Sequence, residues 1–169
     1  PKWNLQLGSR FSSFLRLGQE LNTYAADNPL IFNQDLKIYE AANPIGTEVY
    51  SKGKVIKPFY NLEPRLALAY QIASDRSVKI SYNRMVQYLH LISNTNSPTP
   101  IDVWAPSGKF IDPQLLDQVA VGLFKTFDNN RYNLELEGFY KSIQNRLDYI
   151  DGAELIANNA IEQVLLTGK

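Results

Sequence analysis

The side chains that most often carry out catalysis or bind metals are scarce in this sequence. His90 is the only histidine, and the chain has no cysteine. Because a zinc site needs several nitrogen or sulfur ligands, catalytic zinc is not expected. Serine, aspartate and histidine are all present, but no G-x-S-x-G nucleophile elbow occurs. We therefore interpret His90 as a histidine of an aromatic girdle or of a loop base, and predict no metal, cofactor or catalytic residue.

Glu135 and Glu137 form a pair of carboxylates whose spacing suits acid–base chemistry. On one face of a β-strand they would lie about 7 Å apart, close to the separation found in glycosidases. Nothing in the neighbouring sequence marks either residue as the acid of such a pair, and Lys125 or Lys141 is available as an ionic partner. We interpret the two glutamates as part of a polar wall and predict that the chain is not an enzyme.

The composition restricts the possible fold classes and the possible binding partners of the chain. The 169 residues carry 17 Lys and Arg and 17 Asp and Glu, and a chain without a clustered basic surface is not expected to bind nucleic acid. No run approaches the roughly 18 apolar residues of a membrane-spanning helix. The beginning, Pro1–Asn4, is no signal peptide and lacks an initiator Met, so we expect a processed or excised chain. Ten Tyr and many turn-forming residues favour β-structure.

Hydrophobic residues alternate with polar ones over long stretches, and this decides the fold class. Between Phe59 and Ala73 every second residue is apolar or aromatic, apart from Pro64, and the residues between are polar or small. A period of two predicts a strand of about a dozen residues. The same pattern predicts strands over residues 2–17, 78–88, 116–127 and 131–149, with a sixth over 161–169.

Turns and irregularities follow from the same pattern. We predict tight turns at Ser74–Arg76 and Asp128–Asn130, and a bulge near Ser142, where the parity of the apolar residues slips. Arg84 interrupts an apolar face, so it is expected near an end or next to a bulge. We predict an all-β, antiparallel up-and-down sheet with strand one and residues 161–169 as open edges. One face of that sheet, exposed in the isolated chain, should carry Leu62, Leu66, Leu68, Val78, Ile80, Val119, Val121, Leu134 and Leu136.

The predicted connections alternate in length. Short turns alternate with long segments at residues 18–58, 91–115 and 151–160. Short turns at one edge and long loops at the other are typical of outer-membrane barrels, and strands of this length exceed the five or six residues usual in soluble sheets. We therefore predict an open excerpt of a large transmembrane β-barrel with extracellular loops and periplasmic turns. A soluble antiparallel sheet with its polar side to water is the alternative.

Three strings carry a resemblance to a known family. They are FYNLEPRLALAYQI (Phe59–Ile72), SVKISYNRMVQYLHLISNTNSPTPIDVWAPSG (Ser77–Gly108) and DQVAVGLFKTFDNNRYNLELEGFYKSIQNRLDYIDGA (Asp117–Ala153). From about Pro58 onward, and more faintly over Lys2–Leu17, the chain resembles the C-terminal barrel of Bacteroides-type TonB-dependent outer-membrane receptors. That family has a plug domain, a TonB box and about 22 strands. The resemblance implies that residues 1–169 are a partial barrel domain in the outer membrane of a Gram-negative bacterium.

The resemblance also implies partners. They are the protein's own plug domain, the missing barrel strands, the TonB energy-coupling complex, outer-membrane lipid and, in some members, a surface lipoprotein. In the family, polar walls of the barrel interior contact the plug. The charged residues assigned to that interior are Glu63, Arg65, Lys79, Asp117, Glu135, Glu137 and Lys141. Glu63 and Arg65 are the strongest candidates for plug contacts. The alternative is that these charges pair with one another in exposed salt bridges that contribute little stability.

The loop between Leu91 and Leu115 is the candidate for ligand recognition. Asn94, Asn96 and Trp104 are its proposed ligand-binding residues, since the flat amphipathic face of Trp can stack on a ligand; the alternative is a loop that packs on itself. The resemblance implies an importer of a scarce nutrient such as an iron chelate, cobalamin, a glycan or a peptide. Two other functions stay open: a non-transporting barrel or adhesin, and a soluble β-rich binding module.

Overall fold

The computed structural model describes residues 2–18, 20–92, 103–127, 131–150, 153 and 160–168. These residues are all-β: they form thirteen strands and two short 3-10 turns. The strands make one five-stranded sheet and four two-stranded sheets. None of the described residues forms a helix long and apolar enough to cross a membrane. The predicted all-β class with antiparallel pairing is confirmed.

The chain divides into two compact units. The first, called the strand unit here, comprises Pro1–Ser12, Tyr60–Val86 and Leu115–Gln144. The second, called the loop unit, comprises Ser13–Phe59, Gln87–Gln114 and Asn145–Lys169. The strand unit therefore contains most of the long predicted strands, and the loop unit contains most of the predicted long connections.

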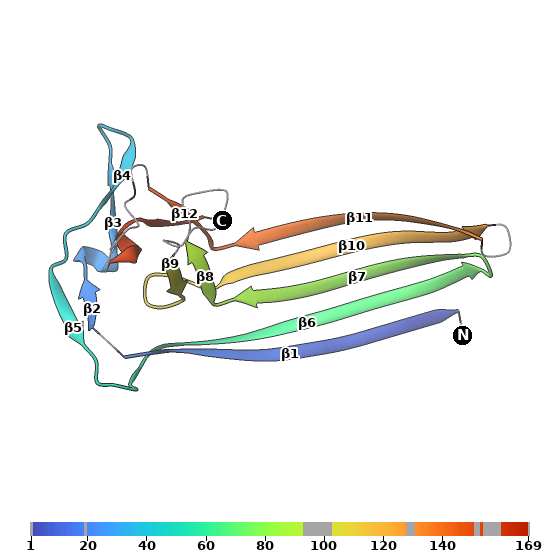
Figure 1. Ribbon diagram of the computed structural model, residues 1–169, viewed down its shortest axis with the longest axis horizontal. Helices are drawn as coiled ribbons and strands as arrows, with labels where there is room; N and C mark the ends of the chain where they lie inside the picture. The colour runs from blue at the N-terminus through green and yellow to red at the C-terminus, as the bar shows by residue number, and fades with distance from the viewer. Residues whose placement is uncertain are drawn as a thin grey trace. The chain divides into compact units, whose positions relative to one another are not determined.

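Five long strands form the large sheet in the order β1-β6-β7-β10-β11. Neighbouring strands run in opposite directions (Figure 1), as in an up-and-down meander. β1 and β11 are the two edges, and within the described residues no sheet is closed. The strands are β1 (Trp3–Leu17), β6 (Val55–Ala73), β7 (Arg76–Gln87), β10 (Gln114–Phe127) and β11 (Tyr132–Gln144).

The register places the apolar residues on one face. Leu68 pairs with Ile80 in β6–β7, and Leu123 pairs with Leu136 in β10–β11. Residues directly opposite each other project to the same side, so the alternation of each strand is carried into its neighbour. The nine residues predicted to share this face are exposed or half-buried, and no second layer covers them among the described residues. The predicted face and its exposure are confirmed.

The predicted turns and the predicted bulge can be compared with the observed ends of the strands. The turn at Ser74–Arg76 is confirmed, since β6 ends at Ala73 and β7 begins at Arg76. β10 and β11 pair without a register shift from Leu115↔Gln144 to Phe127↔Tyr132, and Asn145, with a φ of 57°, follows the last pair. The predicted bulge near Ser142 is therefore wrong: Asn adopts the left-handed region more readily than most residues and here ends β11. The turn at Asp128–Asn130 lies outside the described residues.

The predicted sixth strand is confirmed only in part, because a strand is present but it is shorter and does not join the large sheet. Ile161–Gln163 forms a 3-10 turn, η2, and β13 (Leu165–Gly168) pairs with β12 (Arg146–Tyr149) instead of joining the large sheet. The open edge opposite β1 is therefore β11. Val164 and Leu165 are buried in a hydrophobic cluster, so this segment is held by side-chain packing that alternation alone does not reveal.

The connections of the loop unit are folded into short hairpins. β2 (Glu20–Thr23) pairs with β5 (Gly46–Val49). Between them lie the 3-10 turn η1 (Ala25–Asp27) and the hairpin of β3 (Leu30–Asn33) with β4 (Ile38–Ala41). β8 (Leu89–Ile92) pairs with β9 (Val103–Pro106). The described core lies in this unit and consists of Ile92, Ala105, Ile111, Val164 and Leu165.

Polar contacts tie distant segments of the loop unit together. The buried Tyr24 hydroxyl donates to Glu162 Oε1 at 2.8 Å, and burial together with this carboxylate raises the pKa of Tyr24. Gln163 Nε2 donates to the Ala42 carbonyl at 2.7 Å, and Asn145 Nδ2 donates to the Pro113 carbonyl at 2.9 Å. The connections thus form one packed body.

Replacement of Gly18 by Ala should destabilise the loop unit. A Cβ at Gly18 would lie 2.5 Å from the Ser51 carbonyl oxygen and 3.2 Å from that of Lys54. Because these are backbone atoms, the chain must shift, at a cost of roughly 1–3 kcal/mol. Gly138→Ala is the control, since nothing lies within 4 Å of its Cβ position. Denaturant midpoints measured for both variants test this, and equal midpoints would contradict it.

Candidate functional site

Glu63 is the most buried charged side chain on the polar face of the large sheet. It is 2% exposed, and Arg10 Nε of the neighbouring strand lies 3.6 Å from its Oε1. That separation makes an ion pair but exceeds hydrogen-bond length, and Oε1 accepts no hydrogen bond from any described residue. The Arg10 side chain itself is 66% exposed. The polar face therefore carries a buried carboxylate with unused acceptor capacity beneath an accessible guanidinium.

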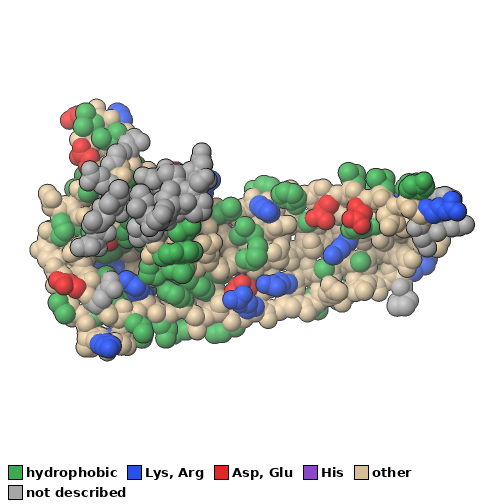
Figure 2. All heavy atoms as spheres, viewed as in Figure 1, with side chains coloured by type: hydrophobic (Ala, Val, Ile, Leu, Met, Phe, Trp, Pro, Cys, Tyr) green, Lys and Arg blue, Asp and Glu red, His purple; other side chains and the backbone are tan. Residues whose placement is uncertain are grey.

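Apart from Asp117, the other predicted wall residues project from the polar side of their strands, as Glu63 does. Lys79 pairs with Ala69, and Glu137 pairs with Gly122. The face turned toward the viewer in Figure 2 carries acidic and basic side chains among polar groups. No ion pair within the described part of the chain joins Arg65, Lys79, Glu135 or Glu137 to a partner.

The lysines expected to pair with the glutamates take other neighbours. Lys125 Nζ lies 4.5 Å from the centroid of the Phe127 ring, and Lys141 Nζ lies 5.0 Å from that of Phe139. Both are cation–π contacts. These predicted wall charges therefore do not form salt bridges with one another. On the polar face, the ion pair found among the described residues joins Arg10 and Glu63.

The predicted position of Asp117 on the interior face is wrong. It has the parity of Val119 and Val121, so it projects from the apolar face of β10. There Arg84 binds it through two hydrogen bonds, Nε to Oδ1 at 2.8 Å and Nη2 to Oδ2 at 2.9 Å. The Tyr82 hydroxyl adds a third at 2.7 Å. Arg84 therefore interrupts the apolar face as a neutralised, bidentate pair, which no spacing rule indicated.

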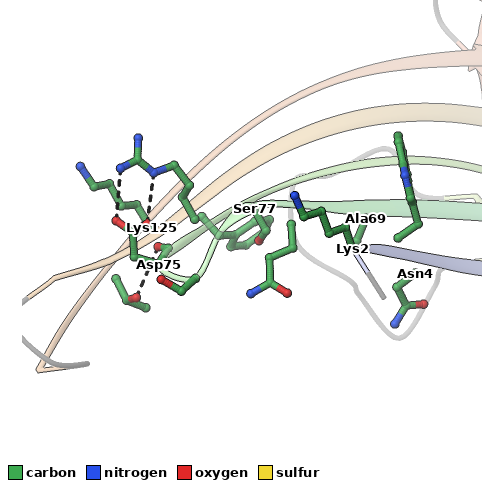
Figure 3. Close-up of a pocket in the computed structure, with 12 residues that line it drawn as sticks. Lys2, Asn4, Ala69, Asp75, Ser77 and Lys125 are labelled. Atoms are coloured by element: carbon green, nitrogen blue, oxygen red, sulfur yellow. Dashed lines mark hydrogen bonds and ion pairs between the residues drawn. The ribbon is translucent and has the colours of Figure 1, made fainter.

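A hollow of about 370 Å³ lies at the end of the strand unit where β6 turns into β7. Figure 3 shows Lys2, Asn4, Ser77 and Lys125 among the side chains around it. The Asp75 carbonyl accepts the Thr126 amide hydrogen at 2.8 Å, which ties the turn to β10. Hydrogen bonds from Arg76 hold the pKa of Asp75 below its usual value. This hollow was not predicted, because it joins residues of four strands, β1, β6, β7 and β10.

Trp104 is the predicted ligand-binding residue that the structure places. It lies on β9 opposite Leu91 of β8 and is 59% exposed. Leu89 and Leu91 are exposed beside it, whereas Ile92 and Ala105 on the opposite side of this hairpin are buried in the core. The hairpin thus holds an exposed apolar strip on a fixed base. Asn94 and Asn96 lie outside the described residues.

A smaller cavity of about 150 Å³ adjoins this hairpin. Polar side chains of Gln87, Gln114, Arg146 and Asp148 line it together with His90, and Ile92, Leu147 and Leu165 supply apolar surface. His90 Nε2 lies 3.2 Å from Ser107 Oγ, and both side chains are buried. Burial lowers the pKa of His90, which keeps the imidazole neutral at neutral pH.

The described residues contain no group of three His, Asp or Glu side chains placed to hold a metal ion. No protein-family model, curated protein or solved structure matches the chain. The features of the described residues that bear on function are the two faces of the large sheet and the hairpin and cavity of the loop unit.

Acid should loosen the β8–β9 hairpin through His90. The unfolded imidazole takes up a proton near its ordinary pKa of 6.5, whereas the buried one resists it. Stability contributed by the neutral form is therefore present above about pH 6.5 and falls as the pH drops below it. Hydrogen exchange of the β8–β9 amides at several pH values measures this. His90→Gln should remove the pH dependence, and an unchanged acid response in that variant would contradict the assignment.

Proposed function

We propose that the chain is part of the wall, with its outer connections, of a TonB-dependent outer-membrane importer of a scarce nutrient. One observation carries the proposal. The five long strands form a single layer whose apolar face is continuous and exposed, with aromatic side chains toward both ends. Exposed apolar patches of this extent are unusual on soluble monomers and indicate an apolar partner. Lipid is the partner that the geometry of these strands fits best.

The aromatic side chains have the spacing of a membrane-spanning strand. Trp3 and Tyr70 are 4.3 Å apart between ring centroids, and Phe11 and Tyr60 are 6.3 Å apart. The ten residue-to-residue steps from Tyr60 to Tyr70 extend about 33 Å along β6. With a strand tilt of roughly 40°, the two rings would be separated by about 25 Å along the barrel axis, which is the height of the apolar band of outer-membrane barrels.

The open edges of the sheet and its polar face support the proposal that these strands belong to a barrel. In hydrocarbon, the unpaired N–H and C=O groups of β1 and β11 must find partners, and bacterial single-chain barrels have a minimum of about eight strands. We infer that further strands of the full-length protein pair with both edges. The polar face would then line the interior, where the exposed Arg10 guanidinium above the buried Glu63 is available to an acceptor of the plug.

The transport role rests on the family resemblance of the strand sequences together with this polar wall. An adhesin or other non-transporting barrel would share the apolar face but would need no contact between the polar wall and a plug. A soluble binding module would place the apolar face against protein and the polar face in water. The orientation of the two faces of β6 separates the soluble alternative from both barrels.

Spin labels on β6 provide the test. The chain has no cysteine, so each of Leu66→Cys, Ala67→Cys, Leu68→Cys and Ala69→Cys introduces the one cysteine of this chain. In the full-length protein in lipid vesicles, labels at 66 and 68 should collide often with oxygen and rarely with a water-soluble nickel chelate. Labels at 67 and 69 should lack this preference for oxygen. Equal access of the chelate to all four positions would favour the soluble module.

An arginine on the apolar face should destabilise the barrel. Leu66→Arg places a charge near the middle of the proposed apolar band between Tyr60 and Tyr70 and should cost about 2–4 kcal/mol of folding free energy in lipid. Ala67→Arg, one residue along the same strand, projects to the polar face at a similar depth and is the matched control. Reversible unfolding in vesicles measures both, and an equal cost for the two variants would refute the facing of β6.

A further inference from the structure

Two basic side chains end the apolar face of the large sheet where β6 turns into β7, called the turn end here. Arg76 begins β7 with the parity of Val78, and Lys125 of β10 lies two residues beyond Leu123. Because side chains alternate along a strand, both project to the side of the apolar rows. The hollow of about 370 Å³ at this end is lined by both (Figure 3), so open space adjoins each cation.

Asp75 offsets only one of these two charges. Its Oδ1 lies 3.2 Å from Arg76 Nε. The Asp75 carbonyl accepts the Thr126 amide hydrogen at 2.8 Å, which holds the turn against β10 beside Lys125. No ion pair within the described residues includes Lys125, and its Nζ lies 4.5 Å from the centroid of the Phe127 ring. Two cations and one carboxylate leave a net charge of +1.

The other charges of the apolar face cancel. In the described strands of the strand unit, the charged residues with apolar parity are Arg76, Arg84, Asp117 and Lys125. Arg84 and Asp117 form a bidentate pair with no net charge. The excess positive charge of this face therefore lies at the turn end, although the chain as a whole has a net charge of zero.

Aromatic rings flank the two cations on the same face. Trp3 of β1 and Tyr70 of β6 are 4.3 Å apart between ring centroids, and Phe127 of β10 pairs with Tyr132 of β11. The sheet order places β7 and β10, which carry the cations, between β6 and β11. In membrane barrels, aromatic rings gather at the interfaces, at the level of the lipid headgroups. The two cations thus lie at headgroup level.

We propose that Arg76 and Lys125 bind the headgroup phosphate of an anionic phospholipid whose acyl chains lie on the apolar face. The inference rests on the proposed function, because it needs this face to lie in lipid. Guanidinium and ammonium groups both donate charge-assisted hydrogen bonds to phosphate oxygens. The net charge of +1 favours a negatively charged headgroup over a zwitterionic one. Short turns of outer-membrane barrels face the periplasm, so the lipid belongs to the periplasmic leaflet.

Quenching by brominated lipids tests this in the full-length protein. A fluorophore on Leu123→Cys reports on the lipid next to Lys125, in vesicles of phosphatidylcholine with a minor fraction of phosphatidylglycerol. Either the phosphatidylglycerol or an equal amount of the phosphatidylcholine is brominated. We expect an enrichment of phosphatidylglycerol of about fivefold at this probe, the effect of one net cation near the surface. A fluorophore on Leu62→Cys, near Tyr60 at the other end of the apolar band, should report none.

Charge variants identify the residues. Arg76→Gln and Lys125→Gln should each remove most of the enrichment, whereas Lys125→Arg should keep it. Asp75→Asn raises the net charge of the site to +2 and should increase the enrichment, a gain that misfolding does not produce. Lys141→Gln is the control with the same loss of charge. Lys141 lies on the polar side of β11 opposite Gln118, and its replacement should leave the enrichment unchanged.

The outcomes separate the site from the barrel. Equal quenching by the two brominated lipids at Leu123→Cys would overturn the headgroup site and leave the barrel standing. The same enrichment at Leu62→Cys, or enrichment that persists when Arg76→Gln and Lys125→Gln are combined, would also overturn the site. Absence of quenching by either lipid at both probes would show that the apolar face does not meet lipid, and would overturn the barrel together with the site.

Discussion

Side chains alternate between the two faces of a β-strand, and this constraint determines how the rest of the structure is arranged. The five long strands have 12 to 19 residues each. Each strand therefore places a long row of side chains on each face of the sheet. A one-residue slip of any strand would exchange its faces. The pairing of Leu68 with Ile80 and of Leu123 with Leu136 keeps the apolar rows together. A single layer with two unlike faces is the result.

Charged groups on this layer are placed where a neighbouring strand can satisfy them. Arg84 and Asp117 neutralise each other on the apolar face through two parallel hydrogen bonds, the strongest geometry available to such a pair. An isolated charge at that place would be costly next to lipid. Glu63, on the polar face, has Arg10 nearby but no hydrogen-bond donor for Oε1 among the described residues. The Arg84–Asp117 pair of the apolar face is thus satisfied within the chain, whereas Glu63 on the polar face keeps an acceptor that no described residue uses.

The loop unit shows that long connections between strands can form a folded body. Its core combines residues from the β8–β9 hairpin with Ile111, Val164 and Leu165, and the contact between Tyr24 and Glu162 spans 138 residues of sequence. Such packing fixes Ile92 and Ala105 at the base of the β8–β9 hairpin, on the side opposite to the exposed indole of Trp104. Ligand contacts on this hairpin would then require little ordering of the chain.

Alternation in the sequence alone determined the all-β class, the meander of long strands, the turn after Ala73 and the composition of the two faces, because a period of two is a local property of each strand. Tertiary structure decided the features that depend on contacts between separate segments. The place of residues 161–168 depends on burial of Val164 and Leu165, and the end of β11 depends on the backbone of Asn145. The pairing of Arg84 with Asp117 and the cavity beside His90 join residues from separate strands. Contacts of this kind depend on which strands become neighbours and in which register, and that information is not contained in the pattern of any single segment.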